Sequence, residues 1–137
     1  MLRRESRVRA RALQILYAWE LQGRPRVRVV ADGLCSLHGA RDRVWERAEA
    51  LAEAVAGDVA VLDAEVAQDI ERWRLARVGV NERNILRLAA HELLRADTPA
   101  PVVISEAVRL AHWFAGAKAP PFVNGVLDAL ARRVGRL

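Results

Sequence analysis

Side chains that could carry out catalysis are few in this sequence and lie far apart. The three histidines, His38, His91 and His112, occur singly, and Cys35 is the one cysteine. The sequence has no HExxH pair and no two closely spaced cysteines, which are the usual metal-ligand patterns. Cys35 also has no obvious base beside it in the sequence. We therefore expect neither metal nor thiol chemistry.

Two adjacent pairs contain catalytic residue types but fit a helix surface better. Ser105 precedes Glu106, and His91 precedes Glu92. Adjacent side chains on a helix point about 100° apart, so neither pair converges on one reacting atom. The phosphate-binding patterns GxxxxGK[ST] and GxGxxG are also absent from the sequence. We predict that the chain is not an enzyme and needs no cofactor.

Arginine side chains near the start of the chain are arranged to bind an anion. At roughly 100° per residue, polar and apolar side chains separate onto opposite faces of a helix. Arginine forms paired hydrogen bonds with phosphates and stacks on bases, so this polar face could bind nucleic acid. A face that is merely solvated is an equally good interpretation of the same residues. The polar face holds Arg3, Arg4, Arg7, Arg11 and Gln14 with Tyr17 at its edge, and the apolar face holds Val8, Ala12, Ile15, Leu16 and Trp19.

The region around Phe122 is a second candidate site. Phe122 falls outside the apolar stripe of its predicted helix and follows Lys118 and two prolines. The ring could stack on a nucleic-acid base, or it could be a hydrophobic staple packed on the preceding loop, and the sequence leaves both open. Asn124 could read a base edge or cap the helix, and capping is the favoured role.

Charge is distributed unevenly along the 137 residues. The chain has 22 basic and 17 acidic residues, and the preference for arginine over lysine is explained best by genomic codon bias. The net charge is +6 over residues 1–28, zero over 29–41, −7 over 42–71 and +6 over 72–137. Two basic ends and an acidic middle suit a protein that meets a polyanion on one side and another partner elsewhere.

The composition predicts a cytoplasmic globular protein that does not bind membranes. Hydrophobic side chains make up 53% of the chain, but no apolar run reaches the roughly 18 residues of a membrane span. No hydrophobic signal segment follows the arginine-rich start. A single cysteine agrees with a reducing compartment.

Apolar residues recur at helical spacing along almost the whole chain, and no alternating strand pattern occurs. The first helix ends at Gly23 and Pro25, and the second covers about residues 27–37 and is closed by Gly39. Over residues 44–73 the apolar stripe predicts one long helix, at most kinked at its glycine, whose acidic residues form a solvated face.

Three further helices are predicted in the second half of the chain. Asn81 caps the first of them. Pro101 stands in the first turn of the next, which ends near Gly116, and the last helix follows residues 120–121. We predict an all-α fold of six to seven helices, forming a single domain over residues 1–137.

Four segments of the chain match a known pattern. They read RARALQILYAWEL (9–21), VNERNILRLAAHELL (80–94), ISEAVRLAHWFA (104–115) and, most specifically, FVNGVLDALAR (122–132). In this order, and over nearly the whole chain, they resemble the NusB transcription antitermination factors. The resemblance implies an all-helical fold of two three-helix halves.

The resemblance also implies a function and a set of contact residues. The family binds the single-stranded boxA element of ribosomal RNA operon leaders together with NusE, a small-subunit ribosomal protein, and helps RNA polymerase ignore terminators. Carried over by position, the RNA contacts are Arg4, Arg7, Arg9, Lys118, Phe122 and Asn124, and the partner contacts are Tyr17 and Glu82. Arg11 joins the RNA set from the helical pattern alone.

The sequence departs from the family pattern at a few positions. Ala10 stands where the family has an acid, and the prolines at 120–121 replace polar residues and stiffen the loop on the RNA side. Arg9 falls nearly opposite Arg7 on the predicted helix, although the family expects both near RNA. That conflict disappears if these arginines lie in an extended arm before the helix.

Two other functions compete with a free-standing RNA-binding factor. Ribosomal RNA cytosine methyltransferases carry a NusB-like domain at the start of a longer chain, but no methyl-donor motif is present here and the sequence ends where the domain ends, which favours the free-standing factor. A helical scaffold without an RNA role would tolerate the loss of the arginines in the first helix.

Overall fold

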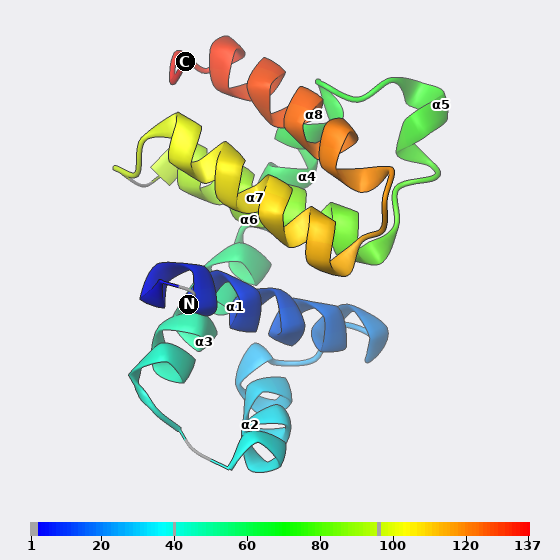
Figure 1. The fold of residues 1–137 in the computed structure, drawn as a ribbon. Coiled ribbons are helices and arrows are strands. Elements are labelled where there is room, and N and C mark those ends of the chain that lie inside the picture. The colour runs from blue at the N-terminus through cyan, green and yellow to red at the C-terminus, as the bar shows by residue number, and fades with distance from the viewer. Residues whose placement is uncertain (1–2, 40, 96) are drawn as a thin grey trace. The chain divides into compact units, whose positions relative to one another are not determined.

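The computed structural model describes residues 3–39, 41–95 and 97–137. In these ranges the chain folds into eight helices and no strands, which confirms the predicted all-α class (Figure 1). Among these helices, none combines the length and the hydrophobicity that a membrane span requires. The helices divide between two compact units, Met1–Gly57 and Asp58–Leu137, and the single domain over 1–137 stays a prediction.

The first unit contains helices α1 (Arg4–Leu21), α2 (Val27–His38) and α3 (Arg43–Gly57), with α1 packed against both others. The predicted apolar face of α1 is buried. Gly39 ends α2 with a left-handed φ of 84°, a conformation that glycine adopts without a steric penalty. The predicted end of the first helix and the predicted bounds of the second are confirmed.

Glutamates of the first unit take part in ion pairs with arginines of other helices or loops. Glu49 is only 7% exposed, and its Oε1 accepts a hydrogen bond from Arg41 Nη1 at 2.8 Å. Glu5 Oε1 accepts one from Arg47 Nη1, also at 2.8 Å, which links α1 to α3. The predicted solvated face is therefore wrong for Glu49, because the partner arginine comes from the loop before α3.

The second unit contains α4 (Val59–Ala67), α5 (Arg72–Leu75), α6 (Val80–Arg95), α7 (Ala100–Phe114) and α8 (Ala119–Arg133). Helix α6 packs against α4, α7 and α8, so it is the central helix of this unit. Most of its apolar residues are almost completely buried, and each buried leucine or isoleucine contributes about 1.5–3 kcal/mol. The buried apolar residues of α6 are Ile85, Leu86, Leu88, Ala89, Ala90 and Leu93.

The prediction of one long helix over residues 44–73 is wrong. Helix α3 ends at Gly57, Asp58 has non-helical backbone angles (φ −108°, ψ 14°), and α4 ends ten residues later at Ala67. Glycine disfavours a helix interior, and the same four-and-three apolar spacing continues across the break, which hides the break from a periodicity argument. The helix count therefore exceeds the predicted six to seven.

Two predicted helix starts also differ from the structure. Asn81 lies inside α6 rather than capping it, and its Nδ2 donates to the Phe114 carbonyl oxygen at 2.9 Å, near the end of α7. That bond supplies a partner for a carbonyl in the last turn of a helix. Helix α8 begins at Ala119, so the prolines at 120–121 stand within its first turn instead of before it.

A buried arginine joins α4 to α6. Arg87 is 1% exposed, and its Nε and Nη2 donate to the two carboxylate oxygens of Asp63 at 2.6 and 2.8 Å. Its Nη1 donates to Asn84 Oδ1 at 2.9 Å. Paired hydrogen bonds of this kind fix both position and direction. Asp63, expected on a solvated face, thus helps to hold the second unit together.

His91, on α6, makes the stability of the second unit depend on pH. Its Nδ1 is buried without a hydrogen-bond partner among the described residues, and burial lowers the pKa of His91 below its ordinary value of 6.5. The unfolded chain therefore binds a proton more readily than the folded one, so stability is lost as the pH falls below about 6.5. Urea unfolding between pH 7.5 and 5 should show this loss.

Two variants test the role of His91. The variant His91→Gln should flatten the pH dependence over this range, because it removes the titrating group. His112→Gln, on the exposed side of α7, is the control and should keep the wild-type dependence. A wild-type slope in His91→Gln would assign the effect to another group.

Candidate nucleic-acid interface

The outer face of α1 presents a row of cations. Arg4 and Arg7 are exposed and lie one turn apart on the same face. Arg11 follows one turn later, is half-buried, and its Nη1 donates to Gln14 Oε1 at 3.1 Å. The structure thus brings Arg4, Arg7 and Arg11 to one side of α1, with Arg4 and Arg7 the more accessible to a phosphate.

Arg9 lies on a different side of α1. Because α1 begins at Arg4, Arg9 belongs to the helix and not to an extended arm, so its conflict with Arg7 persists. Arg9 is only 8% exposed, and its charge adds to the effect of the Arg47 hydrogen bond that lowers the pKa of Glu5. This burial speaks against Arg9 as an RNA contact of the same kind as Arg7.

The start of α8 brings Lys118 and Phe122 together. Lys118 is the exposed N-cap residue, and Phe122 lies one turn further along the helix and is half-buried. The guanidinium carbon of Arg74 lies 4.3 Å from the centre of the Phe122 ring, a close cation–π contact. Phe122 is thus not a bare platform, since an arginine of α5 lies over its ring, and the staple interpretation stays a prediction.

Asn124 does not cap α8. It is the sixth residue of the helix and is exposed, whereas a cap residue precedes the first turn. The favoured interpretation is therefore wrong, because the helix begins earlier than the prolines suggested. Residues two apart on a helix point roughly 200° apart, so Asn124 and Phe122 lie on different sides of α8.

The two predicted partner residues lie in different units. Tyr17, in the first unit, is 41% exposed near the end of α1. Glu82, in the second unit, lies in the first turn of α6 and is half-buried. Both side chains are accessible to a partner, and their role stays a prediction.

The residues of α5 are a part of the candidate interface that the sequence argument missed. Residues 71–77 read ERWRLAR, and Trp73 within them is 62% exposed. A tryptophan between two arginines was a signal for nucleic-acid binding, but the apolar stripe placed Trp73 on the buried face of the long predicted helix. The structure instead places this tryptophan on the surface.

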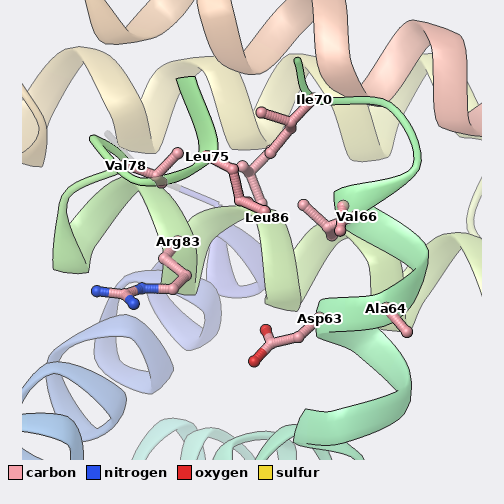
Figure 2. A pocket seen from close by; sticks show the side chains of 9 residues that line it. Asp63, Ala64, Val66, Ile70, Leu75, Val78, Arg83 and Leu86 are labelled. Carbon is pink, nitrogen blue, oxygen red and sulfur yellow. The ribbon is translucent and has the colours of Figure 1, made fainter. Parts of the chain in front are cut away.

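A pocket of about 380 Å³ lies beside α5 in the second unit. Figure 2 shows the apolar side chains of Val66, Ile70, Leu75 and Leu86 gathered around it, and the guanidinium group of Arg83 extending away from them. No residue of α5 is buried. This short helix is therefore attached to α4 and α6 through a few apolar side chains and is not tightly packed against them.

Comparison with known proteins identifies the family. The model of the NusB family matches residues 6–132. The chain belongs to the NusB family. Among its relatives, the transcription antitermination protein NusB of Solibacter usitatus is 40% identical over 133 residues, which cover 93% of this chain and 88% of the relative. The protein of the same name from Sorangium cellulosum is 38% identical over 94% of this chain and 92% of its own length.

Solved NusB structures have the same fold. The crystal structure of antitermination factors NusB and NusE in complex with double-stranded RNA contains a chain that matches this one with a TM-score of 0.83. The two chains are 26% identical, and the match covers 97% of this chain and 99% of that one. The solution structure of Aquifex aeolicus NusB gives a TM-score of 0.80, at 28% identity over 99% and 94% of the two chains. The resemblance seen in the sequence is thereby confirmed, as is the all-helical fold, although the described part of the second unit has five helices and not the three that the resemblance implied.

Proposed function

We propose that this NusB-family protein is a cytoplasmic transcription antitermination factor that binds single-stranded boxA RNA together with NusE and acts in the RNA polymerase antitermination complex. The relatives named above are transcription antitermination proteins, and one solved neighbour was determined with NusE and RNA. The proposal assigns this chain binding and no reaction. Its RNA contacts are Arg4, Arg7, Arg11, Lys118, Phe122 and Asn124.

The exposed arginine row of α1 carries this proposal. Arg4 and Arg7 are free to approach phosphates, and each phosphate neutralised releases condensed counterions, which drives binding. The ring of Phe122 then stacks on an unstacked base of the RNA, and the exposed amide of Asn124 forms hydrogen bonds with the edge of a base. Phosphate contacts give affinity, whereas the aromatic and amide contacts give preference for a sequence.

The protein partner has candidate contact residues of its own on each of the two units. Tyr17 and Glu82 supply an aromatic ring and an acid, residue types that suit an interface with a basic ribosomal protein. In the acidic middle of the chain, Glu46 and Glu53 are exposed and available to such a partner. We propose that RNA and NusE bind together because each adds contact surface for the other.

A titration with RNA tests the proposed function. Fluorescein-labelled boxA RNA, a scrambled RNA of the same composition and a duplex are each titrated with the protein, with and without NusE, at two salt concentrations. We expect weak binding to boxA by the protein alone and a clear gain with NusE. For single strands, the log–log salt slope should be about 0.7 per phosphate contacted.

The controls separate this proposal from its alternatives. Equal affinity for boxA and scrambled RNA in the presence of NusE would contradict specific recognition. A helical scaffold without an RNA role predicts no salt-dependent binding to any of the three RNAs. Preference for the duplex would replace single-strand recognition with recognition of helical shape.

A further inference from the structure

We propose that the α5 segment, residues 71–77, is an additional RNA-binding surface in which Trp73 stacks on a nucleotide next to the one held by Phe122. This inference rests on the proposed function and extends its site by a second aromatic platform. It is carried by the exposure of Trp73, the surrounding arginines and the contact between Arg74 and Phe122.

The indole ring of Trp73 is exposed to solvent and held in place by a hydrogen bond. Its side chain is 62% exposed, and its indole Nε1 donates to Glu71 Oε2 at 2.6 Å. That bond restricts the ring while leaving most of its surface open to solvent. Tryptophan is a large apolar side chain that is usually well buried, so an indole held on the surface is available to stack on a ligand.

The charges around Trp73 favour a polyanion. The α5 segment carries Arg72, Arg74 and Arg77 against the single acid Glu71, a net charge of +2. Arg72 and Arg77 are exposed, and neither forms an ion pair within the part of the chain that the structure describes. Aromatic rings interleaved with free cations are the pattern with which proteins hold single-stranded nucleic acid.

Arg74 joins this segment to the start of α8. Its guanidinium carbon lies 4.3 Å from the Phe122 ring centre, so the two aromatic platforms belong to neighbouring elements of one unit (Figure 1). An arginine held on a ring can keep that contact while a base stacks on the other face of the ring, or it can turn to a phosphate. The contact places the α5 segment beside the start of α8, so a strand bound at Phe122 can continue onto the segment that carries Trp73.

The loose attachment of α5 gives the segment room to adapt. The pocket of about 380 Å³ lies between the side chains that hold the segment, Ile70, Leu75 and Val78, and those of α4 and α6 (Figure 2). Small shifts of α5 therefore disturb few packed contacts. Adjustment of this kind suits single-stranded RNA, whose bases must be accommodated one at a time.

The test compares two RNAs of different length. One is the labelled boxA RNA of the titration, and the other is the same RNA with a single-stranded extension of about six nucleotides at either end. Trp73→Ala and the pair Arg72→Ser with Arg77→Ser are measured against wild type by anisotropy of labelled RNA. Trp113→Ala is the matched control, because Trp113 is an exposed tryptophan, 44% accessible, under Arg109 on α7.

We expect the extended RNA to bind wild type more tightly than the short RNA and to quench tryptophan fluorescence. Trp73→Ala should lose about tenfold in affinity for the extended RNA, as stacking of one base predicts, and little for the short one. Trp113→Ala should keep both affinities. The double arginine variant should lose affinity for the extended RNA and lower its salt slope by about 1.4.

Other results would overturn the inference in distinguishable ways. If both RNAs bind wild type and Trp73→Ala equally well, the α5 segment does not contact RNA, while the proposed function stands. If no RNA binds wild type, the proposed function fails as well. If Trp73→Ala loses affinity for NusE alone, the segment is a protein interface. Because Trp73 is exposed, circular dichroism should show that Trp73→Ala is folded. The double arginine variant tests the same surface with the tryptophan ring still present.

Discussion

Replacing Asp63 with alanine is expected to lower the free energy of unfolding of the second unit by about 3 kcal/mol. The change leaves the guanidinium group of Arg87, which is 1% exposed, without its carboxylate. An uncompensated buried charge costs about 3–5 kcal/mol, and the lower end applies because Asp63 is itself 42% exposed and Asn84 still accepts from Arg87. Urea unfolding followed by circular dichroism measures the loss.

A control and a double variant test this explanation. Asp128→Ala removes an exposed carboxylate that pairs with Arg132 on α8, and it should cost less than about 1 kcal/mol. Asp63→Ala combined with Arg87→Met removes both charges, so the pair should lose clearly less than the sum of the two single changes. Additive losses would mean that the ion pair does not act as a unit.

The sequence predicted two helix boundaries that depend on local chemistry. Gly39 ends α2 and Pro101 stands in the first turn of α7, because the conformations of glycine and proline are set within a residue or two. The division at Asp58 could not be predicted in this way. An apolar stripe continues on both sides of the break, and packing against separate helices decides where it falls.

Pairing between distant residues was the other part that periodicity could not supply. Acidic side chains off the apolar stripe were predicted to be solvated, but Asp63 pairs with Arg87, and Asp69 accepts from Arg133 Nη2 at 2.8 Å. Each partner lies on another helix, α6 or α8, and a helical pattern describes one helix at a time. Acidic and basic side chains that pair across two helices were therefore predicted to lie on separate charged surfaces.

In the candidate interface, too, features of a single helix could be predicted from the sequence, whereas contacts between helices could not. The helical pattern placed Arg4 and Arg7 on an exposed face, and they are exposed. It could not show that Arg74 covers a face of Phe122, because the contact joins α5 to α8 and the predicted continuous helix over residues 44–73 ended inside α5. The exposure of Trp73 was missed for the same reason.

Reversing the charge of Arg4 and Arg7 together is expected to weaken RNA binding by roughly 100-fold or more. Each arginine loses a charge-assisted hydrogen bond worth about 1.5–3 kcal/mol, and about 1.4 kcal/mol corresponds to a factor of ten. The variant Arg4→Glu with Arg7→Glu should also reduce the log–log salt slope by about 1.4. Helicity should not fall, because acidic side chains near the start of a helix interact favourably with its dipole.

A second pair of arginines in the same unit makes this test specific. Arg26 and Arg43 are exposed at the starts of α2 and α3, so Arg26→Glu with Arg43→Glu changes the net charge by the same amount at comparable positions. Repulsion by net charge alone would weaken binding equally in both variants. A site on α1 predicts a large loss only for Arg4 and Arg7, because only there would the negative side chains lie directly against phosphates. Equal losses would therefore reduce the role of α1 to nonspecific attraction.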